Sequence, residues 1–422
     1  MSHNKKMNNN QPLLPELLAP AGSFDKLVAA VHYGADAVYL GGSRFSLRAR
    51  AGNFTENGLR RALVYAHEHG VRGYVTVNIF AHNSDLEDLG DYLRFLRDAG
   101  VDGLIIADPG ILLMARETVP DLPVHLSTQA NVTNRASARF WVSQGVCRLN
   151  LARELGLDEI KQIRAATDTE LEFFVHGAIC ISYSGRCMLS NYFTGRDANL
   201  GDCAHPCRYS YHLVEEKRPG QYFPVEEDER GTYIFNSRDL CLLGRLPDLV
   251  AAGVDSLKIE GRMKSVGYVG SVVRVYRAAL DWIGQQVAAG REAGECVLPG
   301  RFSAELAKVG TRGRTENFFS GPPDGGSMLY DRSRTAQPWA PVGIVRDAAA
   351  LLIEARNVLE TGDCIEYLGR GLNTVSCVVS RMSFENGGAT NRANPGNRVR
   401  LTTDPVIAHP ENNALFLKKM TD

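Results

Sequence analysis

The chain contains 422 residues, more than one ordinary hydrophobic core requires, so two or three domains or one barrel with a smaller companion are expected. A composition of 44% hydrophobic and 23% charged residues excludes a disordered or fibrous protein. The 47 Lys and Arg residues are balanced by 48 Asp and Glu residues. A surface that is basic all over is therefore excluded, whereas a local basic face is not.

Residues 1–12 are polar and rich in asparagine, and no apolar segment of signal-peptide length follows their lysines. We therefore expect a disordered tail over 1–12. No stretch of the sequence approaches the roughly eighteen apolar residues of a membrane span. The nine cysteines are too few for a disulfide-stapled secreted scaffold. Together these features predict a cytoplasmic protein whose thiols are reduced.

Short apolar runs alternate with segments of helical periodicity through the first part of the chain. Gly34, Gly100 and Gly253 each follow a helical segment, where a left-handed glycine ends the helix and leads into the next strand. Eight such repeats over about 265 residues are typical of a (β/α)8 barrel, which we expect over 13–320. The alternative is an open, doubly wound sheet, because periodicity does not reveal strand order. The expected strands are 16–19, 37–40, 73–78, 103–107, 124–128, 148–151, 172–175 and 256–259.

The regular spacing breaks after the seventh expected strand, where a Cys-rich insertion occupies 176–240. Within it, alternating apolar and polar residues around an acidic turn predict a β-hairpin over 211–235. A helix over 269–287 and a helical stretch from Ser303 follow the eighth strand. A Gly/Pro/Ser-rich linker over 321–341 then leads to several short strands, which predict a small β-barrel over 342–422.

Four of the nine cysteines lie within 28 positions of the insertion, with six, fifteen and three residues between them. Four thiolates suit a tetrahedral zinc ion or an iron–sulfur cluster. The six-residue gap fits structural zinc poorly and favours an iron–sulfur cluster. The expected metal ligands are Cys180, Cys187, Cys203 and Cys207, with Cys241 as a reserve ligand. The other cysteines, for which small buried packing roles are expected, are Cys147, Cys296, Cys364 and Cys377.

Active sites of (β/α)8 barrels form where the strands end, so the residues just beyond each strand are candidates for binding. Here they include arginine, lysine, histidine and amide side chains, which favour an anionic, carboxylate-bearing small molecule beside the metal centre. A structural ion pair is the alternative for Lys258 and Glu260. No G-x-S-x-G, H-E-x-x-H or P-loop pattern is present, and no catalytic residue is predicted. The predicted substrate-binding residues are Arg48, Arg50, Asn78, Gln129, Arg153, His176, Lys258, Glu260 and Arg262.

Segments 16–22, 34–39, 172–208 and 256–262 together resemble peptidase family U32, the collagenase-like peptidases, over nearly the whole chain. The cysteine block is the most specific part of this resemblance. Segments 45–50 and 127–131, Asn78 and the C-terminal β-barrel are most similar to one branch of the family. That branch carries out prephenate-dependent 5-hydroxylation of the wobble uridine in tRNA.

The resemblance implies a four-iron cluster held by the four cysteines of the insertion. Because other branches replace the last cysteine with a later one, Cys207 and Cys241 both stay open as the fourth ligand. It also implies tRNA and prephenate, a dicarboxylate, as partners. From their position alone, Arg48, Arg50, Arg153 and Arg262 are candidates to hold prephenate.

Our leading hypothesis is therefore an iron–sulfur enzyme of tRNA modification. The alternatives are a peptidase, as the family name says, and a non-enzymatic iron–sulfur accessory protein for another hydroxylase. Because phosphate contacts dominate tRNA affinity, a local basic surface is expected, and the arginine-rich barrel mouth is the first place to look.

Overall fold

The computed structural model describes residues 14–46, 53–179, 189–194, 204, 213–214, 222–223, 226–228, 231–233, 238–311, 313–321 and 337–420. The tail expected over 1–12 and most of the linker expected over 321–341 lie outside these residues. Within the described part of the chain, no helix combines the length and the apolar content needed to cross a membrane.

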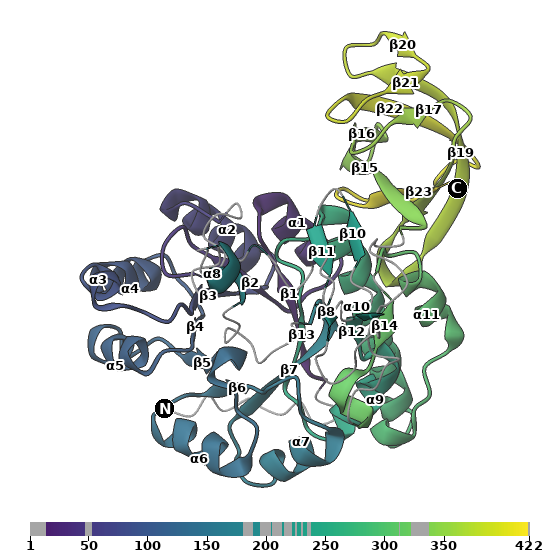
Figure 1. Cartoon of the computed structure of the whole chain (residues 1–422). Coiled ribbons are helices and arrows are strands. Elements are labelled where there is room, and N and C mark those ends of the chain that lie inside the picture. The colour runs from purple at the N-terminus through teal and green to yellow at the C-terminus, as the bar shows by residue number, and fades with distance from the viewer. Residues whose placement is uncertain are drawn as a thin grey trace.

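Eight parallel strands form a closed barrel in the first part of the molecule (Figure 1). Consecutive strands pair in chain order, and the last strand pairs with both the first and the seventh. This closure confirms the predicted (β/α)8 barrel and excludes the open sheet. The strands are β1 Glu16–Pro20, β2 Ala37–Gly41, β3 Arg72–Val77, β4 Gly103–Ile106, β5 Val124–Leu126, β6 Arg148–Asn150, β7 Glu170–Gly177 and β13 Ser256–Ile259.

Helices surround the barrel and cover the outer face of its strands (Figure 1). In α4, Leu89, Tyr92, Leu93 and Leu96 recur at helical spacing and are buried against the sheet. The predicted glycine stops are confirmed, since Gly34, Gly100 and Gly253 have φ of +93°, +81° and +74°. The helices are α1 Phe24–His32, α2 Glu56–Glu68, α3 Asn83–Leu86, α4 Leu89–Asp98, α5 Pro109–Thr118, α6 Arg135–Ser143, α7 Leu157–Arg164, α9 Leu246–Ala251, α10 Val266–Ala288 and α11 Gly300–Leu306.

The insertion after β7 contains short elements among its described residues. They are α8 Leu189–Thr194, β8 Leu213–Val214, β9 Tyr222–Phe223, β10 Glu226–Asp228, β11 Gly231–Tyr233 and β12 Asp239–Cys241. β8 pairs with β9 and β10 with β11, so two short antiparallel pairs stand where one hairpin was predicted. β12 pairs antiparallel with the last two residues of β7, His176 and Gly177. It also pairs in parallel with β14, Arg314–Thr315.

The C-terminal part is a second, antiparallel barrel of six strands with its own apolar core. It closes because β18 pairs with both β19 and β23. β15 begins at Trp339, inside the segment expected as a linker. The six strands are β15 Trp339–Asp347, β16 Leu352–Ala355, β18 Cys364–Leu368, β19 Thr374–Phe384, β22 Arg398–Asp404 and β23 Leu415–Lys419.

The C-terminal barrel docks on the side of the large barrel that carries α10 and α11 (Figure 1). Arg274 of α10 is 2% exposed and donates to the carbonyl oxygens of Gly369 and Asn373 at 2.6 and 2.9 Å. Its guanidinium also pairs with Glu305 at 2.8 Å. The Tyr33 hydroxyl donates to the Leu368 carbonyl at 2.8 Å. These buried polar contacts hold the two barrels in one relative orientation.

Candidate functional site

The interior of the large barrel is polar at its lower end, where the strands begin. The carboxylate of Glu16 accepts hydrogen bonds from Arg148 at 2.6 Å, Ser256 at 3.0 Å and Tyr74 at 2.8 Å. Arg72 forms a further ion pair with it. Burial by itself would raise the pKa of Glu16, but the Arg148 and Arg72 guanidiniums outweigh it and hold the pKa below its ordinary value.

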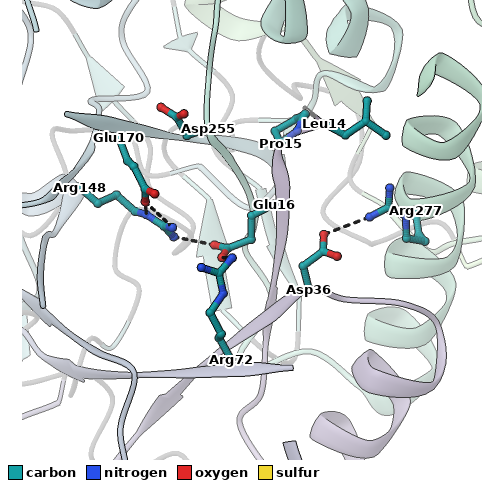
Figure 2. A pocket seen from close by; sticks show the side chains of 9 residues that line it. All are labelled: Leu14, Pro15, Glu16, Asp36, Arg72, Arg148, Glu170, Asp255 and Arg277. Atoms are coloured by element: carbon teal, nitrogen blue, oxygen red, sulfur yellow. Dashed lines mark hydrogen bonds and ion pairs between the residues drawn. The ribbon is translucent and has the colours of Figure 1, made fainter. Parts of the chain in front are cut away.

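A cavity of about 260 Å³ opens at this lower end (Figure 2). Every charged side chain that lines it has a partner of opposite charge, for example Arg277 with Asp36 at 3.0 Å and Arg148 with Glu170 at 2.7 Å. Because these charges neutralise one another, we interpret the cavity as part of the ionic framework of the barrel. The lining residues are Leu14, Pro15, Glu16, Asp36, Arg72, Arg148, Glu170, Asp255 and Arg277.

Ion pairs continue upward through the barrel toward the mouth, where the strands end. Glu172 lies 3.5 Å from Arg148 and accepts a hydrogen bond from Lys258 at 2.7 Å. The Lys258 ammonium also lies 4.7 Å from the centre of the Tyr39 ring. Lys258 therefore forms its ion pair with Glu172 and not with Glu260, the partner considered from the sequence. Glu260 instead accepts a hydrogen bond from the Tyr39 hydroxyl at 3.2 Å.

Arg262 spans the mouth of the barrel and is only 5% exposed. Its guanidinium donates to Ser46 at 3.0 Å, Thr76 at 3.1 Å and Asn53 at 3.2 Å. Gly41 leaves space for this side chain, since a Cβ there would lie 2.5 Å from a guanidinium nitrogen. Arg262 is thus a rigid, positively charged group in the mouth. It is held by two residues that follow β2, Ser46 and Asn53, and by Thr76 near the end of β3.

Asn78 and Gln129, both predicted site residues, meet across the mouth. The Asn78 amide donates to Gln129 Oε1 at 2.5 Å, and the Ser127 hydroxyl donates to the same oxygen at 3.2 Å. Gln129 lies in the 3-10 turn Thr128–Ala130 that directly follows β5 and is 2% exposed. The closing of the barrel therefore brings together amides that are 51 residues apart.

Arg153 lies beside Lys258 at the same end of the barrel. Its guanidinium donates to the Ala178 carbonyl at 2.9 Å and lies 4.8 Å from the centre of the Phe174 ring. Lys258 is 5.4 Å from the same ring. Lys258 is already neutralised by Glu172, so Arg153 and Arg262 are the two arginines at this end of the barrel that suit a carboxylate.

His176 is directed away from this group. The pairing of β7 with β13 shifts between Lys258 and Ile259, and His176 turns toward helix α10. Its Nδ1 lies 3.2 Å from the Tyr276 hydroxyl, and burial lowers its pKa to about 3. The reserve ligand Cys241 pairs with His176 across the sheet, and its sulfur lies 4.0 Å from the same hydroxyl.

Several predicted site residues lie outside the described residues. They are Arg48, Arg50, Cys180, Cys187, Cys203 and Cys207. Among the residues that are described, no group of three or more His, Cys, Asp or Glu side chains could hold a metal ion. Of the four cysteines expected to be buried, Cys296 and Cys377 are buried, whereas Cys147 and Cys364 are exposed, so for these two the expectation was wrong.

Other polar residues of the mouth were missed because they lie within strands rather than just beyond them. Tyr39, Thr76 and Asn150 belong to β2, β3 and β6, and Thr76 and Asn150 are 5% and 2% exposed. A polar residue inside an otherwise apolar strand was the available signal, because the interior of a barrel is usually filled by branched apolar side chains.

Comparison with known proteins places this chain among relatives of similar length. A model of peptidase family U32 matches residues 22–329. The chain is 38% identical to tRNA hydroxylation protein P1 of Bacillus subtilis over 94% of both chains. It is 40% identical to tRNA hydroxylation protein P of Escherichia coli over 72% of this chain and 74% of the relative. It is also 35% identical to "Uncharacterized protease MJ0090" of Methanocaldococcus jannaschii over 97% of this chain and 99% of the relative.

Proposed function

We propose that this chain, which belongs to peptidase family U32, is an enzyme that hydroxylates tRNA. The observation that carries this proposal is the likeness to two tRNA hydroxylation proteins, one of which matches 94% of the chain at 38% identity. The names of these relatives describe them as proteins of tRNA hydroxylation. A protein that acts on tRNA would work in the cytoplasm.

The finer proposal is hydroxylation at C5 of the wobble uridine, dependent on prephenate. It rests on the resemblance of segments 45–50 and 127–131 to that branch of the family. The barrel mouth supports it chemically, since Arg262 and Arg153 supply two guanidiniums, the groups that pair best with carboxylates. Arg262 is the strongest candidate, because its guanidinium is already fixed in one position and loses little freedom on binding.

An iron–sulfur cluster is the cofactor that we propose. Its ligands would be Cys180, Cys187 and Cys203, with Cys207 or Cys241 as the fourth, and four thiolates are the donor set that such clusters take. When bound, such a cluster would supply electron-transfer chemistry. The residues of the mouth would bind the substrate, orient it and exclude water.

The test is nucleoside mass spectrometry of tRNA from a strain that lacks the gene. Complementation with the wild-type gene restores 5-hydroxyuridine, whereas Cys187→Ala does not. Cys364→Ser, an exposed cysteine of the C-terminal barrel, is the matched control and restores it fully. Equal 5-hydroxyuridine in the deletion strain and the wild type would contradict the proposal. Gelatin or peptide cleavage by the anaerobically purified protein would favour the peptidase alternative instead.

The cluster is tested separately by counting iron and acid-labile sulfide in protein purified without oxygen. We expect about four of each per chain for a four-iron cluster. Comparing Cys207→Ala with Cys241→Ala identifies the fourth ligand, because only loss of a ligand lowers the count and the visible absorbance. A protein that holds a full cluster but modifies no tRNA would be an accessory protein.

A further inference from the structure

Several buried polar atoms have no hydrogen-bond partner among the described residues, among them His125 Nδ1 inside the large barrel, and two of these atoms lie in the upper part of that barrel. They are Nε2 of Gln129 and Oδ1 of Asn150, and both side chains are 2% exposed. Buried polar atoms of native proteins are nearly always paired, so an unpaired donor and an unpaired acceptor in one region require an explanation. A bound ligand that completes both hydrogen bonds is one such explanation.

The topology places both residues at the mouth. Asn150 ends β6, two residues after Arg148, whose guanidinium lies inside the barrel. Because side chains two apart in a strand share a face, Asn150 also faces inward, one layer nearer the mouth. Gln129 follows β5, which is the neighbour of β6, and reaches Asn78 beyond β3. Its side chain therefore crosses the mouth rather than pointing to solvent.

The hydrogen bonds of Gln129 determine which end of its amide is available. Oε1 already accepts from Asn78 and Ser127, so the free group is the Nε2 donor. On Asn150 the free atom is the Oδ1 acceptor. The two residues lie on neighbouring segments, since Leu126 pairs with Leu149 and the Thr128 hydroxyl donates to the Leu151 carbonyl at 3.1 Å. A donor and an acceptor offered by neighbouring segments are complementary to a ligand edge that presents a carbonyl oxygen beside an N–H. Uracil presents this pattern at C4=O and N3–H, whereas cytosine presents an amino group beside an unprotonated N3.

We propose that Gln129 and Asn150 recognise the imide edge of a uracil base that is flipped into the mouth of the barrel. Gln129 Nε2 donates to the carbonyl oxygen of the base, and Asn150 Oδ1 accepts its N3–H. Enzymes that act on a base in RNA commonly extrude it into such a pocket and read this edge. The C5–C6 edge lies on the other side of the ring and stays free. The inference rests on the proposed function and identifies the residues that select uridine.

The first experiment alters the ligand, so that it does not depend on the folding of a variant. Anticodon stem-loop RNAs that carry uridine, N3-methyluridine or cytidine at the wobble position are titrated with the full wild-type chain, and binding is followed by fluorescence anisotropy. We expect the uridine RNA to bind about tenfold or more tightly than the other two, since each lost hydrogen bond leaves a buried protein group unpaired. Equal affinities for the three RNAs overturn the proposal.

The second experiment separates recognition from a purely structural role. In Asn150→Leu the acceptor is gone, so N3-methylation of the base no longer weakens binding, although the affinity for uridine RNA is lower. If the methyl group weakens binding to Asn150→Leu as much as to the wild type, Asn150 does not contact N3. A structural role alone would not change this ratio.

The third experiment measures 5-hydroxyuridine in tRNA from the complemented deletion strain. Gln129→Glu keeps an oxygen for Asn78 and Ser127 but presents a carboxylate to the base carbonyl, and we expect 5-hydroxyuridine to fall at least tenfold. The control is Asn134→Asp, which makes the same amide-to-acid change at the N-terminus of α6. It keeps a side-chain oxygen that accepts from the Ser137 N–H, so the level of 5-hydroxyuridine stays unchanged. Failure of the wild type to restore 5-hydroxyuridine refutes the proposed function. Restoration by both the wild type and Gln129→Glu refutes this inference alone.

Discussion

The two ends of the large barrel differ in how their buried polar groups are satisfied, and strand β6 carries one residue of each kind. Arg148, at the lower end, is 2% exposed and pairs with Glu16, Glu170 and Glu172. Asn150, two residues later at the mouth, is equally buried but has an acceptor without a partner among the described residues. The ion pairs of the lower end are thus completed within the protein, although His125 Nδ1 also has no partner among the described residues. The mouth holds an unpaired donor and an unpaired acceptor for a ligand.

This difference matches the division of labour known for (β/α)8 barrels, in which one end provides stability and the other function. At the lower end, removing the buried guanidinium of Arg148 takes one ion pair from each of two buried carboxylates, Glu16 and Glu172, which is costly. At the mouth, unpaired groups already lower the stability of the free protein, and binding would recover that loss. Mutations at the two ends are therefore expected to have opposite effects on stability.

The largest expected effect is that of Arg148→Met. Loss of the guanidinium leaves the Glu16 and Glu172 carboxylates without this buried partner, so the free energy of unfolding falls by about 3–5 kcal/mol. Urea denaturation of the full chain, followed by circular dichroism, measures the change. As the comparison, Arg153→Met at the partly exposed rim lowers the free energy of unfolding by less than about 1 kcal/mol. Similar losses in the two variants would contradict a special role for the lower network.

The next effect concerns His125, which lies in the barrel interior against Tyr74 of the lower network. Burial, together with Arg148, Lys258 and Arg72, holds its pKa well below the ordinary value, so it stays neutral in the folded protein. The unfolded chain binds a proton below pH 6.5 and the folded chain does not, so stability falls as the pH drops below 6.5. One such group lowers the free energy of unfolding by about 1.4 kcal/mol for each pH unit below 6.5.

His125→Gln removes this titrating group, so the free energy of unfolding should fall less steeply between pH 6.5 and 5, by about 1.4 kcal/mol per pH unit. Chemical denaturation at a series of pH values measures the slope. His69→Gln changes an exposed histidine on the outer surface and serves as the control. An unchanged slope in His125→Gln would mean that the interior of the barrel accepts a charged histidine.

The smallest effect is expected for Asn150→Leu. Because the Oδ1 atom has no partner among the described residues, replacing the amide with an apolar side chain of similar size removes an unpaired buried group. We expect the free energy of unfolding to stay constant or to rise by up to about 1 kcal/mol, while tRNA hydroxylation falls. A loss of more than about 1 kcal/mol would show that Asn150 is part of the structural framework, as Arg148 is.

Much of the fold followed from local patterns. All eight barrel strands lie where short apolar runs predicted them, and the glycines at 34, 100 and 253 end their helices in the left-handed conformation as expected. These features depend on neighbouring residues only, so periodicity and turn chemistry are sufficient to predict them.

The candidate site was predictable only in part. The position of a residue just beyond a strand placed Asn78, Gln129, Arg153, Glu260 and Arg262 at the mouth, because all strands of a parallel barrel end on the same side. Lys258 instead lies within β13 and pairs with Glu172 inside the barrel, and substrate binding by these residues stays a prediction. The same argument placed His176 there, and a register shift in β7 instead turns it toward α10. Local sequence carries no signal for a shift that depends on the neighbouring strand.

By itself, the sequence determined the alternation of strands and helices, the spacing of the cysteines and the family to which the chain belongs, because each of these is written in residues close together in the chain. Only the tertiary structure decided which buried polar groups find partners. Closing the barrel brings Arg148 to Glu16 across 132 residues and Arg262 to Ser46 across 216. Pairing between such distant residues depends on the geometry of the closed sheet, and that geometry leaves Gln129 and Asn150 with hydrogen bonds still to make.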